Sequence, residues 1–141
     1  MSDEQRLLLE QLRKKVTSAI DLVEASVART GEYDSTQNMS PEELEPFDAL
    51  SDRFVRAVET AIRYFRARER FEESVSPDTL RDLLPHMQKL RLVNSVETWM
   101  DMRDVRNRIA HDYTPEQAAR LYRDIRGPFF EELERLRDRL Q

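Results

Sequence analysis

Apolar residues recur at steps of three and four along most of the chain, the spacing that places side chains on one face of an α-helix. One such stripe runs from Leu9 to Val27 and a second from Phe47 to Phe65. A third runs from Trp99 to Ile109, and a fourth from Ala118 to Leu140. Because runs of β-branched residues are absent, this pattern predicts an all-α protein whose helices each bury one face against their neighbours.

Each expected long helix begins with a residue type that caps helices. A serine or threonine there accepts a hydrogen bond from a backbone N–H of the first turn, and a glutamate or glutamine three residues later returns the bond. The expected caps are Ser2, Ser40, either Asn94 or Ser95, and Thr114. Gly31 is expected to end the first helix and residues 31–39 to form a loop. Gly127-Pro128 is expected to kink the last helix near its middle.

The region between the second and third stripes is less regular. Within residues 71–92, Ser76-Pro77 is expected to start a short helix, which Pro85 interrupts or follows with another. No internal repeat or linker-like composition marks a second domain, so residues 1–141 are predicted to form one domain. Short connections favour antiparallel neighbours. The sequence thus predicts an antiparallel up-and-down bundle of four long helices and one short helix.

The amino-acid composition indicates the cellular compartment in which the protein is expected to work. There is no cysteine, so no disulfide framework or thiolate metal site is expected, and a reducing cytoplasm fits. The N-terminal residues MSDEQRLLLE are acidic where a signal peptide is basic, and no segment approaches the roughly 18 apolar residues of a membrane helix. We therefore expect a soluble cytoplasmic protein with no membrane contact.

The charge balance bears on nucleic-acid binding. Charged residues make up 36% of the chain, against about 25% in typical globular proteins, which favours helices with solvated outer faces. The net charge of −5 argues against a nucleic-acid binder held by overall charge alone. A local basic groove remains compatible with this balance.

The segment RNRIAHDYTPEQ, residues 106–117, concentrates the chain's most reactive side chains at the join of two helices. Arg106 carries a planar guanidinium that suits phosphate, and His111 carries an imidazole, which exchanges protons near neutral pH. Asn107 lies four residues before His111, so the two are expected to share a helix face, where the amide orients the imidazole or holds a phosphate oxygen. The structural alternative is stabilisation of the negative helix C-terminus by Arg103, Arg106, Arg108 and His111.

A histidine and cations without a metal suit RNA cleavage by its own 2′-hydroxyl. This reaction needs proton removal, proton delivery and positive charge at the phosphate. Asp104 and Asp112 are lone carboxylates without metal-ligand spacing, so neither a metal nor a cofactor is expected. One histidine cannot easily serve both proton roles in one step. A two-fold homodimer would supply two copies of Arg106 and two of His111 to a composite site.

The eight residues 106–113, with the sequence RNRIAHDY, resemble the Arg-x4-His-x-Tyr motif of the HEPN superfamily. They are most similar to its HepT-like prokaryotic branch, which is paired with minimal nucleotidyltransferases in toxin–antitoxin modules. The resemblance extends over residues 44–125, including the stretches FDAL, KLRLVNSVETW and HDYTPEQA. It implies a HEPN-like helical homodimer in which arginine and histidine of both chains face a shared cleft. Active members of the superfamily are metal-independent endoribonucleases.

The resemblance also assigns roles to individual residues. Arg106 and His111 take the catalytic positions, and Asn107 takes the polar position that often follows the arginine. Tyr113 matches the tyrosine that, in some toxins of this branch, the partner nucleotidyltransferase modifies with AMP. The expected function is an RNA-cleaving toxin controlled by a minimal nucleotidyltransferase antitoxin. The alternative is a non-catalytic adaptor or antitoxin subunit that binds a nucleotidyltransferase or its nucleotide substrate, as other relatives are described.

Arginines recur along the second stripe at steps compatible with one helix face, and Tyr64 and Phe65 interleave with them. Such a face can guide an RNA backbone. The alternative is a solvated face whose positive charge Glu59 and Glu69 balance. The residues expected to contact RNA are Arg63 and Arg66 on this helix, and Arg103 and Arg108 beside the motif.

Two ring-bearing residues outside the motif are expected to have structural roles. His86 follows Pro85 at an expected helix start. Trp99 lies on the apolar stripe of its helix. It is therefore expected in the core or in the dimer interface.

Overall fold

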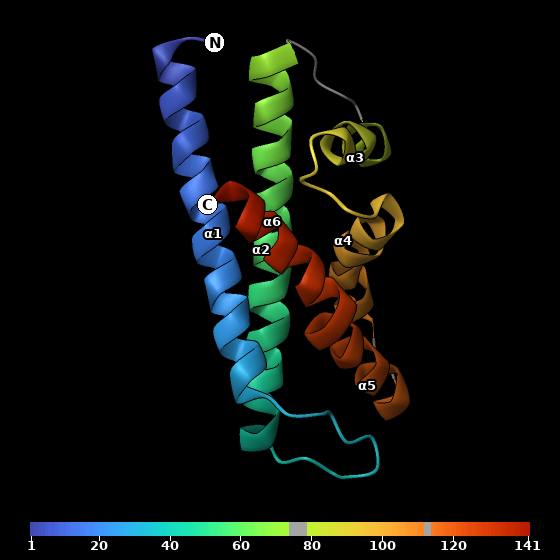
Figure 1. Cartoon of the computed structure of the whole chain (residues 1–141). Helices are drawn as coiled ribbons and strands as arrows, with labels where there is room; N and C mark the ends of the chain where they lie inside the picture. The colour runs from blue at the N-terminus through green and yellow to red at the C-terminus, as the bar shows by residue number, and fades with distance from the viewer. Residues whose placement is uncertain (74–78, 112–113) are drawn as a thin grey trace.

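The computed structural model describes residues 1–73, 79–111 and 114–141, and all regular structure in these ranges is helical. Helix α1 spans Asp3–Arg29 and α2 spans Pro41–Glu73. Figure 1 shows these two helices side by side and antiparallel, running the length of the molecule. The shorter α3 spans Leu80–Lys89, and α4 spans Val96–Ala110. Both lie on the opposite side of α2 from α1 (Figure 1).

The last helix is built from three consecutive segments. Helix α5 spans Pro115–Asp124, the kinked segment η1 spans Ile125–Phe129, and α6 spans Phe130–Leu140. The backbone leaves the helical path at Gly127, with φ −112° and ψ −109°. The predicted kink at Gly127-Pro128 is therefore confirmed. Counted as one bent helix, these segments complete the predicted all-α bundle of four long helices and one short helix, which is also confirmed.

Most predicted caps are present. Ser2 and Thr114 form capping boxes with the glutamines three residues later, and Ser40 forms the corresponding box with Glu43. Of the two candidates for the start of α4, Ser95 is the cap, because its hydroxyl accepts a hydrogen bond from the backbone N–H of Thr98 at 3.2 Å. These helix starts could be read from sequence because each depends on residues only three positions apart.

Two expected boundaries differ from the structure. Helix α1 ends at Arg29, and the extended backbone of Thr30 stops it before Gly31, while the Thr30 hydroxyl donates to the Ser26 carbonyl. The described start of α3 is capped by Thr79, and Pro85 lies inside this helix without ending it. The expected start at Ser76-Pro77 lies outside the described residues.

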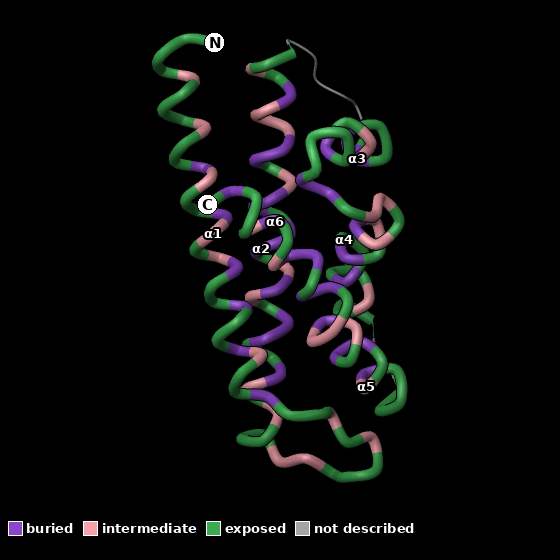
Figure 2. Tube along the Cα trace, viewed as in Figure 1, coloured by how far each residue is buried: buried purple, intermediate pink, exposed green. Residues whose placement is uncertain are grey.

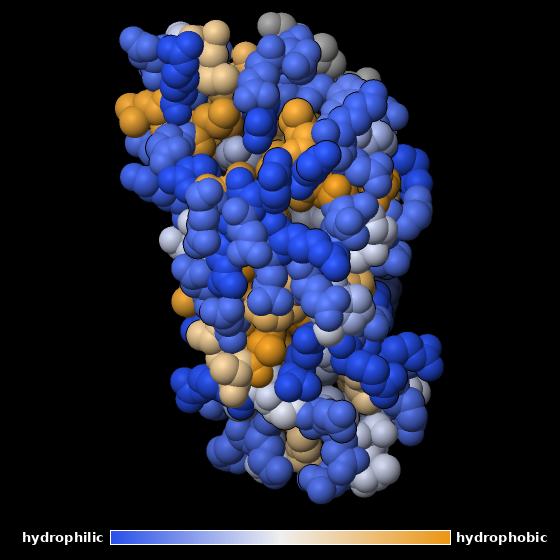
Figure 3. Space-filling model, in the orientation of Figure 1, coloured by the Kyte–Doolittle hydropathy of each residue, from blue (hydrophilic) through white to orange (hydrophobic). Residues whose placement is uncertain are grey.

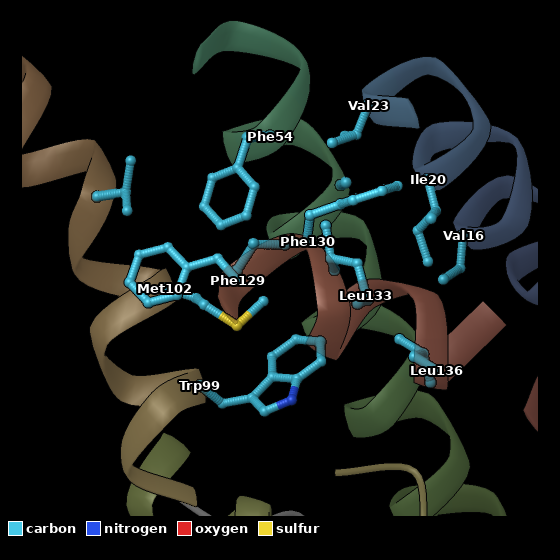
Figure 4. Packing of buried hydrophobic residues seen from close by; sticks show 14 of the residues in the cluster. Val16, Ile20, Val23, Phe54, Trp99, Met102, Phe129, Phe130, Leu133 and Leu136 are labelled. Carbon is cyan, nitrogen blue, oxygen red and sulfur yellow. The ribbon is translucent and has the colours of Figure 1, made fainter. Parts of the chain in front are cut away.

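The core lies where the last helix packs across α1, α2 and α4. Figure 4 shows side chains from all four of these elements meeting around α6, and Figure 2 shows the buried positions on the facing sides of the helices. Trp99 is fully buried there, so it belongs to the core. The labelled contributors are Val16, Ile20 and Val23 of α1, Phe54 of α2, Trp99 and Met102 of α4, and Phe129, Phe130, Leu133 and Leu136.

A buried carboxylate fixes the start of α4 against α6. Glu132 is only 3% exposed, and its Oε1 accepts hydrogen bonds from the backbone N–H groups of Asn94 at 2.7 Å and Ser95 at 3.1 Å. The same oxygen accepts from the indole Nε1 of Trp99 at 3.1 Å, and Arg135 donates to Oε2 at 3.1 Å. A buried carboxylate is stable only when donors surround it, and a helix N-terminus offers such donors. Glu132 therefore sets where α4 begins.

The outer faces of the helices are mainly polar. Figure 3 shows hydrophilic residues over most of one face, with apolar patches that include the region near the N-terminal end of α1. Leu7 and Leu8 are exposed on this part of α1. Among the residues that the structure describes, no helix combines the length and the hydropathy needed to cross a membrane.

Candidate functional site

A groove of about 560 Å³ runs between α2 and α4. The residues that form its walls are spaced mostly three or four apart on each helix, so one face of α2 lies opposite one face of α4. Val58 and Met102 are buried and form its apolar base. The polar lining consists of Glu59 and Arg66 from α2, and Arg103, Arg106 and Asn107 from α4. The groove thus concentrates positive charge on a chain whose overall charge is negative.

Arg106 reaches across this groove to α2. Its Nη1 lies 2.5 Å from Oε1 of Glu59, and the two side chains are 72% and 43% exposed. Ion pairs this exposed contribute little to stability because water and salt screen them. The guanidinium is therefore held in the groove by a contact that another anion can replace.

The groove continues into a second hollow of about 330 Å³, which Glu59 and Arg106 also line. Arg56 and Ile109 lie along this continuation. Ile109 ends the predicted apolar stripe of α4, yet its side chain is 37% exposed. The C-terminal part of α4 therefore presents an apolar side chain to solvent beside the cationic groove.

The predicted shared helix face of Asn107 and His111 is not formed. Helix α4 ends at Ala110, and His111 follows with an extended backbone, φ −98° and ψ 144°, and an exposed side chain. The Asn107 amide donates instead to Oδ1 of Asp104 at 3.0 Å. His111 is not among the residues that line the groove. Within one chain, the described structure brings Arg106 and Asn107 together and places His111 beyond the helix end.

The other predicted site residues are distributed around this groove. Arg66 and Arg103 line it, whereas Arg63 is exposed on α2 without lining it. Arg108 lies near Asp124 of the last helix, with 3.8 Å between Nη1 and Oδ2. Tyr113, the expected modification site, lies outside the described residues.

The observed ion pairs also bear on the two structural alternatives, the helix dipole for the arginines of α4 and charge balance for those of α2. Arg108 lies in the last turn of α4, where the helix-dipole alternative places it, and both Arg106 and Arg108 also pair with carboxylates, those of Glu59 and Asp124. The carboxylate of Glu59, one of the two that the alternative interpretation uses to balance the arginines of α2, contacts Arg106 of α4. An ion pair between residues 47 positions apart leaves no local pattern in the sequence.

A second carboxylate with an unexpected partner is Glu69. Its buried Oε1 lies 2.5 Å from Nδ1 of His86, which is half exposed. This contact joins α2 to α3 and agrees with the structural role expected for His86. Sequence reasoning missed the role of Glu132, although a signal existed. Glu132 follows Phe129 by three positions on an apolar stripe, where an acidic residue needs donors.

Comparison with protein families gives a match over most of the chain. The family described as "Nucleotidyltransferase substrate binding protein like" matches residues 10–141. The matched range contains every residue of the groove and the whole segment 106–113. Searches of curated proteins and of solved structures found no match.

Proposed function

Because this chain belongs to the nucleotidyltransferase substrate binding protein like family, we propose that it is a HEPN-type toxin that cleaves RNA under the control of a partner nucleotidyltransferase. The observation that supports this best is the groove between α2 and α4. Arg66, Arg103 and Arg106 line it, and Glu59 is the single carboxylate among its lining residues in the described chain. Guanidinium groups in such a groove suit the phosphates of an RNA backbone.

The proposed reaction needs only groups that this chain carries. The 2′-oxygen of RNA forms a bond to phosphorus while the bond from phosphorus to the 5′-oxygen breaks. One imidazole takes the proton of the 2′-hydroxyl, and a protonated imidazole gives a proton to the departing 5′-oxygen. The guanidinium of Arg106 stabilises the negative charge that develops at the phosphate. The products are a 2′,3′-cyclic phosphate and a free 5′-hydroxyl.

The two imidazoles would come from two copies of the chain. His111 lies past the end of α4 and does not line the groove of its own chain, which supports a site in which a second copy brings an imidazole close to Arg106. The exposed Ile109 beside the groove gives a two-fold contact an apolar contribution. In an isologous dimer both chains contribute the same surface, so Arg106 and His111 of each copy would face one cleft.

Replacing Arg106 with alanine is the experiment that tests this function. RNA cleavage by the unmodified protein should persist in EDTA, because protons and guanidinium charge carry the proposed chemistry. The Arg106→Ala variant should lose about 10²–10³-fold in rate, as enzymes do when one donor that stabilises the transition state is removed. Arg106→Lys should recover only part, since lysine lacks the planar fork.

The matched control is Arg139→Ala, which removes an exposed arginine from the last turn of α6. Its cleavage rate should equal that of the unmodified protein. Equal loss in both variants would show that overall charge, and not Arg106, governs the rate. Cleavage that survives Arg106→Ala would place the activity elsewhere or in a contaminant.

Modification of Tyr113 is the expected means of control. A phosphodiester-linked AMP on Tyr113, which follows Arg106 and Arg108 closely in the sequence, is proposed to pair with these arginines and to occupy the space of an RNA phosphate. With ATP, the partner nucleotidyltransferase should raise the mass of this chain by AMP units and suppress cleavage. Tyr113→Phe should block the mass change and retain cleavage. Equal labelling of this variant would exclude Tyr113 as the target.

The wording of the family description favours a second candidate function. A substrate binding protein would hold a nucleotidyltransferase or its nucleotide without cleaving RNA, and the dimer and groove would then be a docking surface. The cleavage assay separates the two candidates. A purified dimer that binds the nucleotidyltransferase but leaves RNA intact in every condition would support the adaptor.

A further inference from the structure

A second polar hollow lies away from the groove, between the connection that follows α1 and the bend in the last helix. Its volume is about 250 Å³. It shares no lining residue with the groove between α2 and α4. Figure 1 shows the connection between α1 and α2 at the same end of the molecule as α5. The lining includes Glu32, Tyr33, Tyr122, Arg123, Arg126 and Gly127.

Two arginines of the last helix face this hollow one helical turn apart. Arg126 is anchored, because its Nη2 donates to the backbone carbonyl of Thr30 at 3.1 Å. Its Nε is buried and has no hydrogen-bond partner within the described residues. Arg123 is exposed, and in the described chain neither arginine forms an ion pair with Glu32, the carboxylate that also lines the hollow. Arg123 therefore presents a guanidinium to the hollow that can donate hydrogen bonds to an anion, while Arg126 is held at its wall by the carbonyl of Thr30.

The wall of the hollow beside the arginines is aromatic. The ring of Tyr33 stacks on that of Tyr122, with centroids 5.3 Å apart and planes at 21°. The ring of Phe47 lies nearly perpendicular to that of Tyr33, with centroids 5.2 Å apart and planes at 79°, and supports it from the core. Tyr33 itself is half buried. A supported, partly exposed ring offers a face on which a planar base can stack.

The bend of the last helix gives this hollow its backbone edge. Gly127 departs from helical geometry at the kink between α5 and α6 and lines the hollow. The hollow is smaller than the about 300–1,000 Å³ of pockets that enclose a whole drug-sized ligand. It fits a phosphate and part of a sugar, with the base outside against Tyr33.

We propose that this hollow binds the phosphate of a nucleotide, held by Arg123 and Arg126, with the base against Tyr33. The nucleotide is either free in solution or one unit of an RNA chain, because both present the same phosphate and base. The site requires no bond to form or break. It therefore stands apart from the RNA cleavage proposed above, and either proposal can fail without the other.

Calorimetric titration of the full chain with AMP and with a short oligoadenylate tests this site. Arg123→Gln should weaken binding of one of these probes about tenfold, the effect of losing a hydrogen bond to a charged group. The matched control, Arg120→Gln, removes an exposed arginine of α5 that does not line the hollow. It should leave both affinities unchanged. Because Arg123 is exposed, the variant should fold normally, and its circular dichroism would check this.

The two probes identify the source of the nucleotide. Weaker AMP binding in Arg123→Gln assigns the hollow to a free nucleotide, and weaker oligoadenylate binding alone assigns it to RNA. Tyr33→Leu should weaken the same probe but leave binding of inorganic phosphate unchanged, since phosphate cannot stack. Equal affinities for both probes in Arg123→Gln and the unmodified protein would overturn the proposal. So would an equal loss in Arg120→Gln, which would reflect general charge.

Discussion

Replacing His111 with alanine is expected to slow RNA cleavage by about 10²–10⁴-fold, the range for losing a general acid or base. His111 is exposed at the end of α4 and forms no hydrogen bond with the described residues, so the fold should not depend on it. Single-turnover cleavage of a defined RNA measures the rate. Thermal unfolding of the variant should match that of the unmodified protein, which separates lost chemistry from lost structure.

The chain supplies its own control for this result. His86 is the second of its two histidines, and its Nδ1 contacts the buried carboxylate of Glu69. His86→Gln should lower stability and leave the cleavage rate per folded molecule unchanged. The reverse pattern would move the proton-transfer role to His86.

The same experiment bears on the composite site. A site that uses two copies of His111 can form only in a dimer. Sedimentation should therefore show a dimer at micromolar concentration. A stable monomer that cleaves RNA with full dependence on His111 would contradict the two-copy site, although not the role of the histidine.

Replacing Glu132 with alanine should destabilise the fold by about 3–5 kcal/mol, the cost of breaking a buried charged network. The change removes the acceptor for the partly buried backbone N–H groups of Asn94 and Ser95, and leaves the buried indole N–H of Trp99 without this partner. Urea unfolding should show a lower midpoint with an unchanged slope. Trp99 fluorescence should report the altered surroundings of the indole.

The neighbouring residue is the matched control. Glu131 is exposed on the same turn of α6, and Glu131→Ala should change stability by no more than about 0.5 kcal/mol. Glu132→Gln retains one acceptor oxygen and should fall between the two. A loss in Glu131→Ala as large as in Glu132→Ala would show that acidic charge near the start of α6, and not the hydrogen bonds, matters.

Those features of the fold that depend on neighbouring residues could be predicted from the sequence. The capping boxes at Ser2 and Thr114 and the bend at Gly127 are decided within a few positions of the chain. The apolar stripes predicted the helices because residues on the buried face of a helix recur with the helical period. These signals required no knowledge of which helices touch.

The features that escaped prediction depend on distant contacts. Glu132 bonds to a backbone N–H group 38 positions away, and Arg106 bonds to Glu59 47 positions away. The expected pairing of Asn107 with His111 failed for a different reason. Thr114 begins a new helix, so α4 has to end before it, and the apolar pattern does not say at which residue. The groove of the candidate site therefore emerged only once α2 and α4 were placed together.

The bend at Gly127 has a mechanical consequence for the groove. Below the bend, Asp124 lies beside Arg108 near the end of α4, and above it Glu132 holds the start of α4. The two halves of the bent last helix thus contact α4 near both of its ends, and the angle between these halves helps to determine the position of α4. A change in the angle between α5 and α6 would move α4 along or away from α2 and alter the width of the groove. Gly127, at the bend itself, lines the second hollow. A ligand in that hollow would therefore contact the residue at which the angle between α5 and α6 is fixed, and through this angle it would act on the groove between α2 and α4.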